Sequence, residues 1–166
     1  MNSPSLAPQI LYNDPPFRVV LVEPEIPQNT GSVARLCAAT RCHLILVGKL
    51  GFDLSDAAVK RAGLDYWPLV SWEHQPDLDA FVEGLDPAAC LLFSARSGRS
   101  FTHMAPRRGD YLFFGRETKG LPKGFLQSHP DQCYTLPIRE PGVRSINLAQ
   151  AAAVALYHGL WKTGEI

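Results

Sequence analysis

The residues best suited to chemistry lie near the end of the chain, where a polar loop leads into a helical pattern. Two prolines and a glycine interrupt regular structure between Leu136 and Ile146. Asn147 then suits a helix N-cap, and Gln150 follows at the spacing of a capping box. Such a loop offers unpaired backbone groups, and the helix start adds N–H donors. The stretch therefore suits a small polar ligand, although an ordinary loop before a surface helix has the same pattern.

The helix after this loop carries small residues at helical spacing along one face. The residues of this face are Leu148, Ala151, Ala152, Ala155, Leu156 and Gly159. Small side chains permit close contact with another backbone but make a poor core within one chain. We therefore expect two copies of the chain to bury this face in a symmetric homodimer.

Strand and helix patterns alternate along the chain, and they must position the polar loop. The expected strands cover 17–23, 43–47, 90–93, 110–114 and 132–136, with a short one at 69–70. The expected helices cover 30–40, 55–62, 77–83 and 147–160, the first of them capped by Asn29 or Thr30. This alternation predicts an α/β fold in which helices flank a parallel sheet.

Three polar loops follow strands of the expected sheet, at Ser94, Gly115 and Leu136. In parallel sheets, ligands bind beyond the carboxyl ends of the strands, so the three loops are expected to share one site. The chain contains no GxGxxG, GxxxxGK[ST] or GxSxG motif. A dinucleotide-binding, P-loop or α/β-hydrolase function therefore has no motif behind it.

Length and composition fit one globular domain over 17–166, preceded by a flexible tail at 1–16. The tail has neither the basic start nor the apolar run of a signal peptide, and no window is long and apolar enough to span a bilayer. The four cysteines are scattered and form no CxxC pair, and with the five histidines they give no metal signature. Free cysteines indicate a reducing cytoplasm.

Charge is distributed unevenly, although the formal net charge is zero. The chain up to Ala95 carries six Lys/Arg against eleven Asp/Glu, whereas the segment from Arg96 to Arg144 carries nine against four. A basic segment on a neutral protein suits a polyanion that is bound locally. Ordinary solvated side chains remain the alternative.

Three segments taken together resemble the three motifs of the SPOUT class of RNA methyltransferases, in its branch of ribose 2′-O-methyltransferases. The segments are 27–35 (PQNTGSVAR), 114–122 (FGRETKGLP), and 136–138 (LPI) with 144–148 (RSINL). Each is weak alone, but three in this order after three strands are specific. Segments 23–27 (EPEIP) and 60–67 (KRAGLDYW) further resemble the compact enzymes that methylate the tRNA wobble ribose, at cytidine or uridine 34.

The resemblance implies a C-terminal trefoil knot, a homodimer, the anticodon stem-loop of tRNA as substrate and S-adenosylmethionine (SAM) as cofactor, with no metal. SAM is then expected to contact mainly backbone groups, near Ser94, Gly115, Leu136, Ile138 and Ser145. The residues at the positions of the family's catalytic group are Asn29, Arg35, Glu117, Ser145 and Asn147. For Asn147, helix capping explains the residue as well as catalysis does.

The implied reaction moves a methyl group from a sulfonium to a ribose 2′-oxygen, so the two partners must be held close and in line. Arg35 would act either as the base that accepts the hydroxyl proton or as a cation that binds a phosphate and the forming alkoxide. The sequence departs from the resembled pattern at Gln28 and over 139–142. Two alternatives stay open, namely methylation at another tRNA position or in rRNA, and a knotted RNA-binding protein without catalysis.

Overall fold

The computed structural model describes residues 10–55, 66–95 and 99–166, and within them six strands form one sheet. The strands are β1 (Arg18–Val22), β2 (His43–Val47), β3 (Ser71–Gln75), β4 (Cys90–Phe93), β5 (Tyr111–Phe114) and β6 (Cys133–Tyr134). Their order is β3-β2-β1-β5-β4-β6, and neighbouring strands run parallel. The expected parallel α/β sheet is thereby confirmed.

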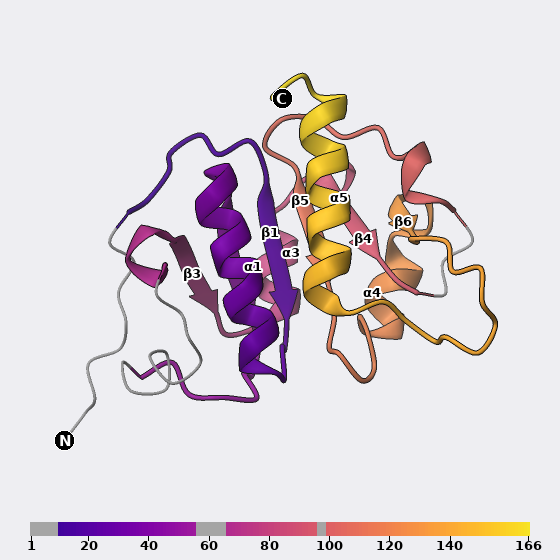
Figure 1. Cartoon of the computed structure of the whole chain (residues 1–166), viewed down its shortest axis with the longest axis horizontal. Coiled ribbons are helices and arrows are strands. Elements are labelled where there is room, and N and C mark those ends of the chain that lie inside the picture. Colours follow the sequence, from indigo (N-terminus) through magenta and orange to yellow (C-terminus); the bar gives the residue numbers. More distant parts are fainter. Residues whose placement is uncertain (1–9, 56–65, 96–98) are drawn as a thin grey trace.

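Helices cover both faces of the sheet (Figure 1). The α-helices are α1 (Pro27–Thr40), α3 (Leu78–Glu83), α4 (Lys123–Ser128) and α5 (Leu148–Lys162). The 3₁₀ turns are η1 (Trp67–Leu69), η2 (Pro87–Ala89), η3 (Phe101–His103) and η4 (Pro130–Gln132). Helices α1 and α5 lie side by side on one face, and α3 and α4 lie on the other.

The alternation of side chains along each strand divides the core between these two faces. In β1, Val19 and Leu21 pack beneath α1 and α5, whereas Val20 and Val22 pack beneath α3 and α4. Strands buried on both faces read as continuous apolar runs, which is why the sequence pattern located them well. Each fully buried aliphatic side chain contributes about 1.5–3 kcal/mol to folding.

Three elements differ from the sequence-based expectation. Helix α1 begins at Pro27, not at Thr30, because proline suits the first helical position. The strand expected at 69–70 is absent from those residues. They belong to η1 and its end, where the N–H of Leu69 donates to the carbonyl of Tyr66, and β3 starts only at Ser71. The last strand, β6, is also shorter than expected. The helix expected at 55–62 lies, beyond Ser55, outside the described residues.

The small-residue face of α5 is buried inside the chain, so the expectation that a second copy covers it is wrong. Ala152 and Ala155 are fully buried, and α5 packs against α1 and β5. A Cβ added at Gly159 would lie 3.1 Å from the ring of Phe17. The small side chains therefore make room for a bulky residue of the chain's own core.

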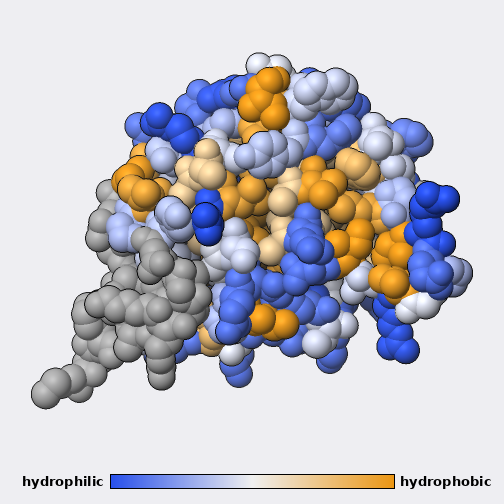
Figure 2. Space-filling model, in the orientation of Figure 1, coloured by the Kyte–Doolittle hydropathy of each residue, from blue (hydrophilic) through white to orange (hydrophobic). Residues whose placement is uncertain are grey.

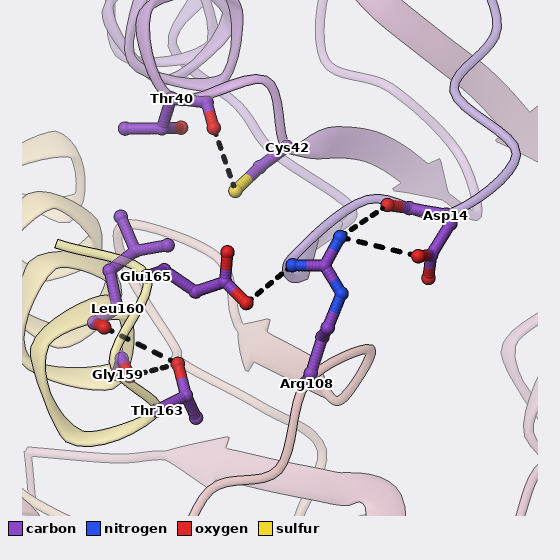
Figure 3. A network of polar contacts seen from close by, with 8 residues as sticks. All are labelled: Asp14, Thr40, Cys42, Arg108, Gly159, Leu160, Thr163 and Glu165. Atoms are coloured by element: carbon purple, nitrogen blue, oxygen red, sulfur yellow. Dashed lines mark hydrogen bonds and ion pairs between the residues drawn. The ribbon is translucent and has the colours of Figure 1, made fainter.

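Both ends of the described chain meet at the pole of the molecule that lies away from the start of α5. Arg108 binds the carboxylates of Asp14 and Glu165 together (Figure 3). A cavity of about 570 Å³ opens beside this arginine, between the chain ends and the last residues of α1. In the described part of the chain, no helix is both long and apolar enough to cross a bilayer.

Candidate functional site

The loops after β1 and β5 meet at the centre of the sheet, where these two strands are neighbours. The chain runs outward from β1 through β2 and β3 and then returns to β4 and β5, so this is the topological switch point where α/β folds bind ligands. Arg116 forms an ion pair with Glu23, and the hydroxyl of Thr118 donates to Glu25 over 2.7 Å. These contacts fix one loop against the other.

Glu117 caps α1 from a distant part of the chain. Its half-buried carboxylate accepts hydrogen bonds from the backbone N–H groups of Glu25 (2.8 Å) and Ile26 (3.0 Å). It also accepts one from the side-chain amide of Asn29, over 3.3 Å. A carboxylate is stabilised by the positive end of a helix dipole. This contact explains how α1 begins at Pro27 although its own N-cap residue, Ile26, makes no side-chain cap bond.

Asn147 joins α5 to the same group. Its Oδ1 accepts from the N–H groups of Ala149 (3.0 Å) and Gln150 (3.2 Å), which confirms the expected cap of α5. Its Nδ2 donates to Oδ1 of Asn29 over 3.1 Å. Asn29, which is 8% exposed, therefore lies between Glu117 and Asn147. The structure thus brings one residue from each of the three motifs into a single hydrogen-bonded chain.

Arg35 stands apart from this chain of contacts. It lies on the exposed side of α1, six positions after Asn29, which is about 9 Å along a helix. Its guanidinium carbon is 4.6 Å from the centre of the Tyr66 ring. Arg35 thus lies outside the core, and its contact with Tyr66 was not expected from the sequence.

Gly115 lies where another part of the chain's own backbone comes very close. A Cβ at this position would lie 2.0 Å from the carbonyl carbon of Gly120 and 2.1 Å from the nitrogen of Leu121. The N–H groups and carbonyls of Arg116 and Gly120 also pair with each other, which closes a tight loop. Gly115 is therefore required first by the approach of the chain's own backbone.

The other residues expected to hold a cofactor follow adjacent strands. Ser94 comes directly after β4, and its N–H donates to the carbonyl of Tyr134 in β6 over 2.9 Å. Leu136 and Ile138 are half-buried just beyond β6, whereas Ser145 is exposed in the loop before α5. Because β5, β4 and β6 are consecutive in the sheet, Ser94, Gly115 and Leu136 lie at neighbouring strand ends.

The loop between β6 and α5 has the chemical character that a nucleoside-bearing cofactor needs. It is irregular and largely exposed, so it offers backbone donors and acceptors. It also carries the exposed apolar side chains Val143 and Ile146. These residues fit a ligand with both polar groups and an apolar ring. In the described residues, no group of three or more His, Cys, Asp or Glu side chains is arranged to hold a metal ion.

The basic segment is only partly available to a polyanion. Arg107, Arg108 and Arg116 each form an ion pair within the chain. Four other cations are exposed on the loops that follow β5 and β6 or at the start of α4, and these are Lys119, Lys123, Arg139 and Arg144. The exposed cations therefore gather at the same end of the sheet as the three motifs.

Two structural details of the site had no clear signal in the sequence. Glu23, which pairs with Arg116, has a φ of 50°, a left-handed conformation that is uncommon for glutamate. In the sequence, the segment that contains Glu23 was noted only for its resemblance to the compact wobble-ribose methyltransferases. Tyr66 was likewise noted only as part of segment 60–67. Its contact with Arg35 becomes visible in the structure alone.

Comparison with known proteins gives consistent matches. The chain matches the model of the SpoU rRNA Methylase family over residues 16–157. It is 46% identical over 151 residues to a tRNA (cytidine(34)-2′-O)-methyltransferase of Burkholderia cenocepacia (strain HI2424), a match that covers 89% of this chain and 96% of that protein.

Two solved structures extend the comparison. One, reported for the 2-OH methylation of C/U34 on tRNA, has a TM-score of 0.79 and 44% identity, and the match covers 88% of this chain and 95% of that chain. The AdoMet-bound rRNA methyltransferase from Sinorhizobium meliloti has a TM-score of 0.75 at 20% identity, with 93% of this chain and 60% of that chain covered. At that identity, the second likeness concerns the fold.

Proposed function

The chain belongs to the SpoU rRNA methylase family, and from this membership we propose that it methylates the 2′-hydroxyl of the wobble ribose, position 34, of tRNA. The nucleoside is cytidine or uridine, and the methyl donor is SAM. The observation that carries the proposal is the contact of Asn29, Glu117 and Asn147, one residue from each motif. Within this group Asn29 is buried, Glu117 is half-buried and Asn147 is exposed, so the three side chains run from the core to the surface of the site.

SAM supplies the methyl group as an electrophile attached to a positively charged sulfur. Backbone groups near Ser94, Gly115, Leu136, Ile138 and Ser145 would hold it, as proposed from the motifs. The half-buried side chains of Leu136 and Ile138 suit its apolar parts. The strand ends that carry these residues are neighbours in the sheet, and the loop before α5 is exposed to solvent.

The tRNA would bind at the same end of the sheet. Lys119, Lys123, Arg139 and Arg144 are exposed there and can contact phosphates, which supply affinity but not base choice. A splayed anticodon loop presents its ribose hydroxyl and bases more openly than a paired stem does. Activity is therefore expected to fall as the salt concentration rises.

The position of methylation is tested with tritiated methyl transfer to a leucine tRNA and to the same tRNA with a 2′-deoxy residue at position 34. We expect label in the first and background in the second. Equal labelling of both would mean that another position, or another RNA, is the substrate. Isothermal titration should show about one SAM per chain, and no heat from SAM or S-adenosylhomocysteine on folded protein would contradict the enzyme.

A homodimer is part of this proposal, but through a different face from the one first expected. The exposed side of α5 carries Val154 (44% exposed), Tyr157 (47%) and Trp161 (65%) at helical spacing. Apolar residues gather across the face that carries α1 and α5 (Figure 2). A symmetric pair of chains would cover this side. Light scattering should give the dimer mass at micromolar concentration, and Trp161→Glu should reduce it toward the monomer.

The proposal also includes a trefoil knot near the C-terminus. Two backbone bonds support it, because Thr135 donates to the carbonyl of Arg99 (2.7 Å) and Phe101 donates to the carbonyl of Thr135 (2.8 Å). The start of the last segment is thus paired with residues 99–101 of the connection from β4 to β5. An experimental structure in which the chain beyond Leu136 passes outside this connection would remove the knot from the proposal.

We place the protein in the cytoplasm, where tRNA is modified. Its four cysteines are free, and three of them, Cys37, Cys42 and Cys90, are buried. Burial raises the pKa of the Cys37 thiol well above its usual value and, with Asp86 and Asp110 nearby, raises that of Cys90 to about 11. Such thiols stay protonated and unreactive, which suits a reducing compartment. Fractionation that found the protein outside the cytoplasm would contradict this placement.

A further inference from the structure

The ring of Tyr66 lies against the guanidinium of Arg35, and no role is assigned to this tyrosine by the motifs. The distance of 4.6 Å between the guanidinium carbon and the ring centre is well inside the ~6 Å range of a cation–π contact. Arg35 belongs to α1, whereas Tyr66 directly precedes η1 on the connection between β2 and β3. The contact therefore joins two separate elements at the exposed surface.

The backbone that carries Tyr66 is anchored by its neighbours. Trp67 is only 5% exposed, and its ring lies 4.9 Å from that of Trp72 in β3. The carbonyl of Tyr66 accepts from the N–H of Leu69 over 2.9 Å, and that of Trp67 accepts from Val70 over 3.0 Å. Because buried Trp67 and these backbone bonds fix the turn, the half-exposed ring of Tyr66 offers a fixed surface to Arg35.

A stacked guanidinium keeps its hydrogen-bonding capacity. Its five N–H groups point outward in the plane of the group, so a ring against one face leaves them available to an anion. Within the described ranges, Arg35 forms no ion pair with a carboxylate, in contrast to Arg108 and Arg116. No described residue therefore binds its N–H edge, which can accept an anionic ligand.

We propose that Tyr66 is a positioning residue, which holds Arg35 as a cation with its N–H edge presented to an anion of the methylation site. The inference rests on the proposed function, and the anion is either a phosphate of the substrate or the forming 2′-alkoxide. The negative face of the ring stabilises the cation over the neutral form. The contact therefore opposes removal of the proton from Arg35 and favours anion binding over the base role.

The test compares Tyr66→Leu, which removes the ring, with Tyr66→Phe, which keeps it, and with Leu69→Ala, a control on an exposed side chain of the same turn. Each change is also made together with Arg35→Ala. We expect Tyr66→Leu to lower kcat/KM for tRNA about three- to fivefold, the usual strength of an exposed cation–π contact. Tyr66→Phe should restore most of this loss. With Arg35→Ala already present, Tyr66→Leu should cause no further loss.

The kinetic constants distinguish the two anions. A loss confined to KM assigns the anion to a substrate phosphate, which is bound before reaction, and a loss in kcat assigns it to the forming alkoxide. SAM affinity by titration should be unchanged in all variants. An equal loss in Tyr66→Phe and Tyr66→Leu, or an additive loss on top of Arg35→Ala, overturns the positioning role.

Faster methyl transfer in Tyr66→Leu would show that Arg35 acts as a base and would also overturn the inference. If the wild-type chain transfers no methyl group to tRNA, the proposed function fails separately. The same variants are then compared for binding of the anticodon stem-loop by fluorescence anisotropy. A loss in Tyr66→Leu that depends on Arg35 supports the inference, and a loss that does not depend on it contradicts it.

Discussion

The side-chain amide of Asn147 donates to the side-chain oxygen of Asn29, between residues that are 118 positions apart in the chain. The bond connects the starts of α5 and α1, the two helices that lie together on one face of the sheet. At its other side, Asn29 donates to Glu117 in the loop after β5. A substitution at any one of these residues should therefore alter the position of the other two side chains.

The two roles of Asn147, capping and contact with Asn29, can be separated. Asn147→Asp keeps an oxygen for the N–H groups of Ala149 and Gln150 but removes the donor to Asn29. We expect its melting temperature to stay near wild type and its kcat/KM to fall about tenfold, the value of roughly one hydrogen bond. Asn147→Ala should lose activity and about 1 kcal/mol of stability as well. Full activity in the Asp variant would leave capping as the sole role.

Glu117 should stabilise the start of α1. Glu117→Ala leaves the N–H groups of Glu25 and Ile26 without their acceptor, and we expect a loss of about 1–3 kcal/mol in the free energy of unfolding. Glu117→Gln keeps one oxygen and should lose less. Urea unfolding measures both, with Lys119→Ala, a change of an exposed side chain in the same loop, as the control. Wild-type stability in the Ala variant would contradict this account of the helix start.

Gly115→Ala should disturb the loop before it affects any ligand directly. The added Cβ meets the backbone of Gly120 and Leu121, so residues 115–121 must move, at a cost of about 1–3 kcal/mol or more. We expect a lower melting temperature together with weaker SAM binding by titration. Gly124→Ala is the matched control, because a Cβ there meets nothing within 4 Å. Unchanged stability with lost SAM binding would instead place the ligand against Gly115 itself.

Arg35→Ala should separate turnover from cofactor binding. The side chain is exposed and outside the core, so the melting temperature should stay within a few degrees of wild type. Methyl transfer should fall at least about a hundredfold, while the Kd for SAM changes less than about twofold. Near-normal turnover would remove Arg35 from the mechanism. An equal loss of SAM affinity would move it into the cofactor site.

His43 should make stability depend on pH. Burial lowers its pKa below the usual value of about 6.5, against a smaller opposing effect of Glu73. The folded chain therefore binds a proton less readily than the unfolded chain. The contribution of neutral His43 to stability is fully present above pH ~6.5, the pKa in the unfolded chain. It is lost as the pH falls from there toward the lower pKa of the folded chain. Melting curves between pH 7.5 and 5.5 should show this loss, and His43→Gln should reduce it. An identical pH dependence in the variant would exclude His43 as its source.

Local patterns predicted the strands well because β1, β2, β4 and β5 are buried on both sides and read as apolar runs. They failed where a distant residue decides the outcome. The start of α1 depends on Glu117, which is about ninety positions away, and no local pattern contains it. The small residues of α5 did not suggest a core within one chain. The ring of Phe17, which packs against Gly159, belongs to a distant part of the sequence.

The candidate site divides in the same way. Asn29, Glu117 and Asn147 were expected in one site because of the resemblance to three family motifs, and the structure places Asn29 in contact with the other two. Their catalytic roles, and that of Arg35, remain predictions. Tyr66 was missed because its effect depends on the distance to Arg35, which spacing along a chain does not give.

The strand order has a consequence for how the chain is made. β1 leaves the ribosome first but occupies the centre of the sheet, where Arg18 is paired with both His43 and Tyr111. Until the segment from Tyr111 to Phe114 has been synthesised, one edge of β1 has no strand beside it. An open apolar edge is a template for pairing with other chains. The half-synthesised polypeptide is thus the form most exposed to aggregation, and molecular chaperones would matter most during the interval between translation of these two strands.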